Sequence, residues 1–430
     1  MNSSLKRVDY LEGKFLEENK SLYLPNSKVL FIGNEASIGL DEELLSKHIL
    51  FIGGIGTGKT NAMLQSIEQI QKNMNKNDVM IIFDTKGDFY NQFYRKGIDA
   101  VISNDDKATG VCNIDYWNLM KEAMVDGDAH LEENLLEICT TLFQEKISKS
   151  QNPFFPLAAK DVFYGILTYL IRRGKAMHNK ELNLFLNQAS IKQVIERLEL
   201  HKDLKSIVNY ISNPESPQTQ GVYSELQQVR RELLVGNFRK EGGLSIRDFV
   251  RNKGGRTLFI EYDLGIGKVL TPIYRLMIDL AIKESLSRNK SEGNVYYIID
   301  EFMLLPNLYH IENGLNFGRS LGAKFIVAMQ NVEQIRSSYG YEIANSILSG
   351  FNTNVSFRVN DYATREFVKS IYGQNRKKIA YNSLVSTQPI REEVILSNVV
   401  EDWDISSLGV GEAIISIGKM QPTKFKFEKY

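Results

Sequence analysis

Cysteine is nearly missing from this sequence: Cys112 and Cys139 are the two cysteines among 430 residues. They lie far apart and form no C-x-x-C motif, which argues against a disulfide framework and against a zinc site. The five histidines also lack the spacing of metal ligands. We therefore expect reduced thiols, as in a cytosol, and no metal that is held by these residues alone.

A dominant charge and a membrane-spanning run are missing as well. The chain has 52 Lys and Arg against 52 Asp and Glu, so it lacks the overall charge of a nucleic-acid-binding protein. A local basic patch or the pore of a ring remains compatible with this balance. The sequence begins without a signal-peptide core, and no apolar run reaches the roughly 20 residues of a membrane helix. We expect a cytoplasmic protein, with any membrane association supplied by a partner, and we assign the longest apolar run, residues 162–171, to a core helix.

What is present instead is a glycine-rich motif. Residues 49–60, ILFIGGIGTGKT, are an apolar strand followed by the full G-x-x-x-x-G-K-[ST] pattern. Glycines let backbone N–H groups approach a polyphosphate, and the helix that follows points its positive dipole end at the same anion. Lys59 is expected to reach the β- and γ-phosphates, and Thr60 to hold Mg²⁺. The predicted nucleotide-binding residues of this motif are Gly53, Gly54, Gly56, Thr57, Gly58, Lys59 and Thr60.

Short buried strands alternate with helices in the first and last parts of the chain. The predicted strands are residues 28–32, 49–52, 79–84, 100–103, 257–262, 295–300, 324–329, 354–359 and 413–417. This alternation is typical of an α/β fold with a mainly parallel sheet. Helical spacing then replaces strand patterns, as in Leu131, Leu135, Ile138 and Leu142. We predict three parts: 1–112 as lead-in and first part of the nucleotide-binding domain, 113–251 as an all-α insertion, and 252–430 as the second part of that domain.

Polar residues follow three of these strands. Asp300 is expected to hold Mg²⁺ through water and Glu301 to orient or deprotonate the attacking water, on a strand beside the phosphate loop. Solvated acids at a strand end fit the same pattern. Because ligands gather at the carboxyl ends of parallel strands, the Gln330 amide is expected beside the γ-phosphate, with a helix cap as the alternative. In the turn 84–88, Asp84 either supports the metal or the phosphate-loop lysine, or forms a plain turn.

Arg319 lies in the helix between the strands that precede Glu301 and Gln330. A cation that meets the charge developing on the γ-phosphate accelerates its transfer, and in ring assemblies that cation can come from the neighbouring subunit. A surface arginine fits the pattern equally well, and Arg336 and Arg358 are rivals for the same role.

Several stretches together resemble the coupling ATPases of type IV secretion and conjugation systems, the TraG/TrwB-type proteins, which are related to FtsK and HerA translocases. The matching residues are 48–60, 83–89, 296–302, 318–340 and 411–425, in this order along nearly the whole chain. Residues 318–340, GRSLGAKFIVAMQNVEQIRSSYG, are the most specific, because generic phosphate-loop ATPases lack them. The resemblance implies a RecA-like P-loop NTPase fold, ATP and Mg²⁺ as cofactors, and ATP hydrolysis.

The resemblance also extends to single residues and to partners. It matches the family's phosphate loop with Lys59 and Thr60, its acidic pair with Asp300 and Glu301, the following glutamine with Gln330, and its interface arginine with Arg319. It implies a homo-oligomer, a hexameric ring around DNA. The all-α part would then meet DNA, a relaxase or other cargo, and a secretion-channel or membrane subunit would be a further partner.

The leading hypothesis is an ATP-driven motor that delivers single- or double-stranded DNA, with bound protein, to a secretion channel. One alternative is an ATP-dependent cargo-docking receptor with little motor activity. Another is a soluble HerA- or FtsK-like DNA translocase in DNA processing or defence. The family's N-terminal membrane helices do not stand in this sequence, so a partner subunit is expected to supply the anchor unless the protein is a soluble relative.

Overall fold

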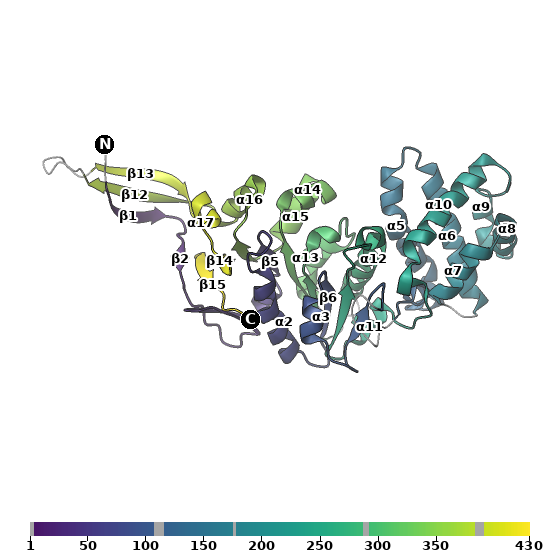
Figure 1. Ribbon diagram of the computed structural model, residues 1–430, viewed down its shortest axis with the longest axis horizontal. Coiled ribbons are helices and arrows are strands. Elements are labelled where there is room, and N and C mark those ends of the chain that lie inside the picture. The colour runs from purple at the N-terminus through teal and green to yellow at the C-terminus, as the bar shows by residue number, and fades with distance from the viewer. Residues whose placement is uncertain (1–3, 107–115, 175–177, 287–291, 383–390) are drawn as a thin grey trace.

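Ten strands form the central sheet of the computed structural model, which describes residues 4–106, 116–174, 178–286, 292–382 and 391–430 (Figure 1). Their spatial order is β2 (Glu17–Glu18), β15 (Thr423–Lys426), β14 (Glu412–Ile417), β11 (Thr353–Phe357), β5 (Ile49–Ile52), β10 (Ala323–Met329), β9 (Val295–Ile299), β6 (Val79–Asp84), β8 (Arg256–Glu261) and β7 (Ala100–Ile102). The seven neighbours from β11 to β7 pair in parallel, and β14 and β15 add antiparallel strands. The predicted α/β fold with a mainly parallel sheet is confirmed.

Helices cover both faces of this sheet. In β5, Leu50 and Ile52 belong to one hydrophobic core, and Ile49 and Phe51 to the other, as strand side chains alternate. The first core is closed by α11 (Ile246–Asn252), α12 (Gly267–Ser285), α13 (Ile311–Leu321), α14 (Val332–Tyr339), α15 (Tyr341–Ser349), α16 (Tyr362–Tyr372) and α17 (Asp402–Ser406). The second is closed by α1 (Glu42–Leu45), α2 (Lys59–Asn73) and α3 (Asp88–Phe93).

The described chain between β7 and α11 is helical. Its helices are α4 (Leu119–Met124), α5 (Leu131–Lys149), α6 (Phe154–Arg173), α7 (Asn179–Gln188), α8 (Ile191–Glu199), α9 (Lys205–Val208) and α10 (Pro217–Leu233), with 3₁₀ turns η1 (Asp128–His130), η2 (Lys202–Leu204) and η3 (Gly236–Arg239). The four leucine and isoleucine positions that predicted a helix all lie buried in α5. We call this segment the helical region. The boundaries at 112 and 251 stay a prediction, because residues 107–115 lie outside the described residues and the helical region shares a continuous core with the sheet.

Helix α6 is long and apolar enough, by length and composition, to cross a membrane. Its most apolar 18-residue window has a mean hydropathy of 1.3, and 67% of that window is buried inside the protein. A buried core helix passes the same test, and Val162, Phe163 and Ile166 of α6 are fully buried. Helix α6 is therefore weak evidence for a membrane span, and the run 162–171 lies in a core helix, as expected.

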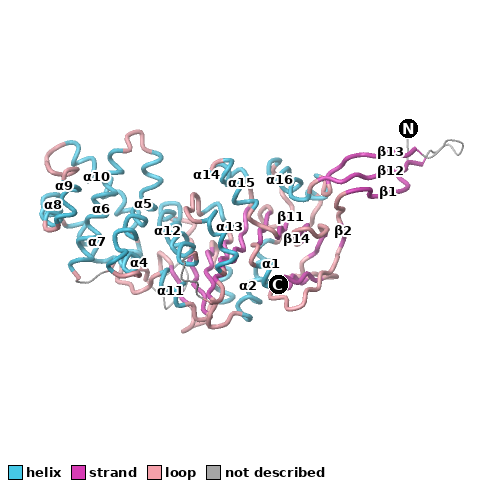
Figure 2. The backbone as a smooth tube through the Cα atoms, turned by 180° about the vertical axis from the view of Figure 1, so that it is seen from behind, coloured by secondary structure: helices cyan, strands magenta, loops and turns pink. Residues whose placement is uncertain are grey.

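A three-stranded antiparallel sheet projects from the body near the start of the chain (Figures 1 and 2). It pairs β1 (Ser4–Glu12) with β12 (Gln374–Asn382) and β12 with β13 (Arg391–Asn398). The sequence pattern predicts no strand here, because these strands have no continuous buried run: Leu396, for example, is 64% exposed. A separate hairpin, β3 (Val29–Ile32) with β4 (Ser37–Leu40), contains the strand predicted at 28–32.

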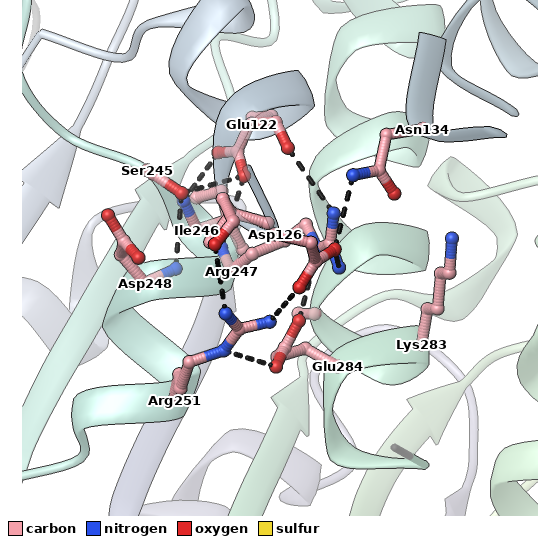
Figure 3. Close-up of polar contacts among 12 residues, drawn as sticks. Glu122, Asp126, Asn134, Ser245, Ile246, Arg247, Asp248, Arg251, Lys283 and Glu284 are labelled. Carbon is pink, nitrogen blue, oxygen red and sulfur yellow. Dashed lines mark hydrogen bonds and ion pairs between the residues drawn. The ribbon is translucent and has the colours of Figure 1, made fainter. Parts of the chain in front are cut away.

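Buried ion pairs join the helical region to the helices of the sheet (Figure 3). Arg247 of α11 lies 2.6 Å from Asp126, which follows α4, and 3.0 Å from Glu284 of α12. Arg251 contacts the same two carboxylates at 2.7 and 2.8 Å. Glu122 of α4 is fully buried and accepts hydrogen bonds from the start of α11. The Arg247 and Glu284 side chains are each 5% exposed, so loss of Arg247 would leave the buried Glu284 with Arg251 as its remaining arginine partner among the described residues.

We expect Arg247→Leu to lower the free energy of unfolding by about 1.5–3 kcal/mol, because Glu284 and Asp126 each lose one of their two arginine partners at a largely buried site. Urea denaturation of the purified protein measures this change. The control is Arg172→Leu, which removes a pair with Asp203 at the surface and should cost about 0–1 kcal/mol. Equal losses for the two variants would contradict this view of the junction.

Candidate nucleotide-binding site

The glycine-rich loop joins β5 to α2, as the motif predicts. At Gly58, φ is +116°, and a Cβ there would lie 2.9 Å from the Gly411 backbone. A Cβ at Gly53 would lie 2.6 Å from the Cβ of Phe357. Glycine is therefore required at both ends of the loop. The N–H groups of Gly53 and Gly54 already donate to the carbonyls of Met329, the last residue of β10, and Arg358, which follows β11. These two glycines therefore shape the loop, and phosphate contact falls to the later N–H groups.

The Lys59 side chain lies back over this loop. Its ammonium donates to the carbonyl oxygens of Gly53 at 2.6 Å and Gly54 at 2.9 Å. Burial lowers the pKa of Lys59, whereas the negative charges of Glu301 and Asp300 raise it. The lysine therefore lies within electrostatic range of both predicted acids, and Thr60 follows it in the first turn of α2.

Glu301 lies at the carboxyl end of β9 and is 8% exposed. One carboxylate oxygen, Oε2, accepts a hydrogen bond from the Gln330 amide. The other, Oε1, is buried and has no hydrogen-bond partner among the described residues. Burial raises the pKa of Glu301 to about 7, although the Gln330 hydrogen bond and the Lys59 charge act in the opposite direction. This carboxyl group can therefore accept or hold a proton near neutral pH.

The strand of the acidic pair is not the direct neighbour of the phosphate-loop strand. The sheet order is β5-β10-β9, so the expectation that Asp300 lies on a strand beside the loop is wrong by one strand. The intervening strand β10 ends at Met329, directly opposite Ile52. Its next residue, Gln330, consequently emerges between the two halves of the site. Local sequence patterns do not encode this order, because it follows from how the helices cross over the sheet.

The turn after β6 contributes a contact that sequence reasoning missed. The Thr85 hydroxyl donates to Oδ2 of Asp300 at 2.6 Å. Burial raises the pKa of Asp300, and the Thr85 hydrogen bond partly opposes this shift. The Asp84 carboxylate instead accepts backbone N–H groups of its own turn, which is the plain-turn alternative. The sequence signal that could have indicated this contact is a hydroxyl residue, Thr85, directly after the strand β6.

Within a single chain, Arg319 lies far from Lys59 and the acidic pair. It lies in the last turn of α13, its side chain is 54% exposed, and its guanidinium is 3.5 Å from Glu43. Strand β10 begins just after this helix and runs seven residues to the site, which is about 20 Å. Of the rivals, Arg336 of α14 lies over the ring of Tyr341 at the start of α15. Arg358 follows β11, where its carbonyl accepts the N–H of Gly54.

The segment after Glu301 connects the site to the helical region. It passes through η4 (Phe302–Leu304) to Tyr309 and His310, whose backbone N–H groups each donate to Asp279 of α12 at 3.0 Å. The His310 ring lies 2.8 Å from the carboxylate of Glu137 on α5. Burial raises the pKa of Asp279 to about 6. The chain therefore reaches a contact with the helical region within ten residues after Glu301.

The donor set fits a polyphosphate with a hard divalent cation. Within the described part of the chain no three His, Cys, Asp or Glu side chains gather around a possible metal. A metal here would thus take the Thr60 hydroxyl, the Asp300 carboxylate and oxygens of a ligand. Such oxygen ligands suit Mg²⁺ held together with phosphates, and the buried, unpaired Oε1 of Glu301 is a proton acceptor at the same edge.

Comparisons with known proteins agree with this geometry. Residues 34–399 match the DNA-binding domain of type IV secretion-system coupling proteins. The chain is 22% identical to coupling protein TraD of Escherichia coli K12 over 352 residues, which cover 80% of this chain and 46% of TraD. It therefore spans about half the length of this curated relative.

Solved structures show the same fold. The bacterial conjugative coupling protein TrwBdeltaN70 has a TM-score of 0.78 at 18% identity, with 99% of this chain and 94% of that chain covered. TrwB with a non-hydrolysable ATP analogue gives 0.76 at 18% identity, covering 100% and 96%. VirB4 of Thermoanaerobacter pseudethanolicus gives 0.60 at 11% identity, covering 96% and 99%. The predicted RecA-like P-loop NTPase fold is thereby confirmed. Because the family match extends over most of the sequence, this chain belongs to the type IV secretion-system coupling protein family.

Proposed function

We propose that this protein is an ATPase that drives the transfer of DNA, alone or with bound protein, to a type IV secretion or conjugation channel. The observation that carries the proposal is the convergence of Lys59, Asp300, Glu301 and Gln330 at one edge of the parallel sheet. ATP and Mg²⁺ are the proposed cofactors; solved TrwB structures hold an ATP analogue in one case and ADP with Mg²⁺ in another. The proposed site of action is the cytoplasm, beside a membrane or channel subunit.

In this proposal the start of α2 binds the polyphosphate. Lys59 exchanges its two carbonyl partners for oxygens of the β- and γ-phosphates, and the N–H groups of Gly56, Thr57 and Gly58 bind the same groups. The Thr60 hydroxyl and the Asp300 carboxylate are the proposed ligands of Mg²⁺, directly or through water. Bound Mg²⁺ neutralises charge on the phosphate oxygens.

Glu301 is the proposed general base. Its Oε1 is buried without a partner in the described structure, and its pKa of about 7 suits a group that accepts a proton from water at neutral pH. The Gln330 amide holds the other carboxylate oxygen, Oε2. Gln330 therefore fixes the orientation of Glu301. It directly follows β10, the strand between that acid and the phosphate loop, and is also suited to sense the γ-phosphate.

Arg319 is proposed to act across a subunit interface in a hexameric ring. Its exposure and its distance from the site of its own chain support a role in trans. The division into residues 1–112, 113–251 and 252–430 is part of the same proposal, with 113–251 as the part that meets DNA, a relaxase or other cargo. The basic run 376–378 on β12 is a weak candidate for DNA contact, because Arg376 and Lys378 already pair with Glu12 and Glu392.

The direct test of this function is DNA-stimulated ATP hydrolysis. We expect hydrolysis to rise with DNA and this stimulation to fall as salt increases, because phosphate contacts release counterions. Lys59→Ala should abolish the activity and weaken ATP binding about 10–100-fold, which is the loss of one or two charge-assisted hydrogen bonds. Lys72→Ala, on the exposed side of the same helix α2, is the matched control. Hydrolysis that ignores DNA at every salt concentration would count against a DNA motor.

Glu301→Gln separates a motor from a docking receptor. The amide keeps the size of the side chain but removes the base, so hydrolysis should fall about 10²–10⁴-fold while ATP stays bound. Hydrolysis rates and DNA transfer between cells are measured together, with the surface variant Glu68→Gln as control. A motor stops transfer with ATP trapped, whereas continued transfer at the wild-type level would favour the receptor.

Arg319→Ala should bind ATP normally and hydrolyse it about 10³–10⁵-fold more slowly, as expected for a cation that acts on the transition state. Mixed with Lys59→Ala subunits, it should regain part of the activity, because some interfaces then combine an intact loop with an intact arginine. Arg336→Ala, tested in parallel, examines the rival. No recovery at any mixing ratio would assign Arg319 a role within its own chain.

A further inference from the structure

Thr85 makes the closest polar contact to Asp300. Its hydroxyl donates a 2.6 Å hydrogen bond to Oδ2 of that carboxylate. The two residues leave the sheet within one residue of the same level, since β6 and β9 pair in parallel with Phe83 opposite Ile299. Thr85 is 5% exposed, so little water competes for its hydroxyl. The contact therefore joins two adjacent strands at the edge of the sheet that carries the proposed nucleotide site.

The turn that presents Thr85 is built from within by Asp84. One Asp84 oxygen accepts the N–H groups of Lys86 at 3.2 Å and Gly87 at 2.9 Å. The other accepts the N–H groups of Phe89 and Tyr90, both at 2.9 Å. The Asp84 residue is fully buried. Four hydrogen bonds to one carboxylate fix the backbone on either side of Thr85, so the position of its hydroxyl does not depend on the phosphate loop.

A hydroxyl bound to one oxygen of a carboxylate limits how that carboxylate can rotate. With Oδ2 held by Thr85, Oδ1 is left as the oxygen of Asp300 that can serve a metal or its water. Outer partners of this kind orient metal-binding groups, and their loss typically costs 10–100-fold in metal affinity or activity. We propose that Thr85 is a positioning residue that orients Asp300 toward magnesium; this inference rests on the proposed function of the site.

A positioning role and a merely structural role make different predictions. If the hydroxyl only satisfied a buried carboxylate, its loss would lower stability and leave the Mg²⁺ requirement unchanged. If it orients Asp300, its loss changes the Mg²⁺ requirement of nucleotide binding and leaves binding without Mg²⁺ as it was. Equilibrium binding of a fluorescent, non-hydrolysable ATP analogue distinguishes the two and needs no turnover.

The experiment titrates Mg²⁺ against analogue binding by the full chain. Thr85→Val keeps the shape of the side chain and removes the hydroxyl, so the Mg²⁺ concentration at half-maximal effect should rise about 10–100-fold. Thr85→Ser retains the hydroxyl and should restore the wild-type requirement. In EDTA, Thr85→Val should bind the analogue like the wild type, whereas Lys59→Ala should bind more weakly under both conditions.

The matched control is Thr168→Val, which removes a buried hydroxyl that donates to the Tyr164 carbonyl in α6. It should leave the Mg²⁺ requirement unchanged. If wild-type binding shows no Mg²⁺ dependence, the proposed function itself fails. If the wild type depends on Mg²⁺ and Thr85→Val does not differ from it, this inference alone is overturned. Should Thr85→Val not fold, Thr85→Ala measured against Thr85→Ser decides by the same criterion.

Discussion

Parallel pairing of the central strands is the constraint on which the site depends. Ile52 of β5 lies opposite Met329 of β10, and Ile299 of β9 lies opposite both Val327 and Phe83. The carboxyl ends of all four strands therefore lie at one edge of the sheet, where the following residues carry the polar groups. If β9 slipped by one residue, each side chain of the strand, including the two acids, would move to the other face of the sheet. The buried apolar residues on both faces hold this register, so the core also sets the geometry of the site.

Much of this arrangement was readable from the sequence. The strands around the site match their predicted ranges within one or two residues, because short apolar runs bounded by polar turns are strong strand signals. The glycine motif also predicted its loop correctly, since both Gly53 and Gly58 meet backbone or side-chain atoms too closely for a Cβ. The order of the strands in the sheet could not be predicted, because it arises from the crossovers between strands. The strand β10 was itself predicted, but its position between the phosphate-loop strand and the strand of the acidic pair was not.

Two further features escaped sequence reasoning for different physical reasons. Thr85 is a common residue in a turn, and its contact with Asp300 exists only because two strands far apart in the sequence pair side by side. Most described residues of the projecting sheet of β1, β12 and β13 are partly or fully exposed. The alternation of apolar and polar residues that marks a half-buried strand is therefore weak in this part of the sequence. The proposed role of Arg319 likewise involves a second subunit, because its side chain is exposed and distant from the site of the same molecule.

The junction of buried ion pairs has a mechanical consequence. Arg247 and Glu284 are almost fully enclosed, and the apolar core runs without interruption from the sheet into the helical region. Bending at this junction would expose paired charges and apolar surface together, at a cost of several kcal/mol. In the proposed ring we therefore expect each subunit to move as a rigid body, so that displacement during ATP turnover would arise at the interfaces between neighbouring subunits.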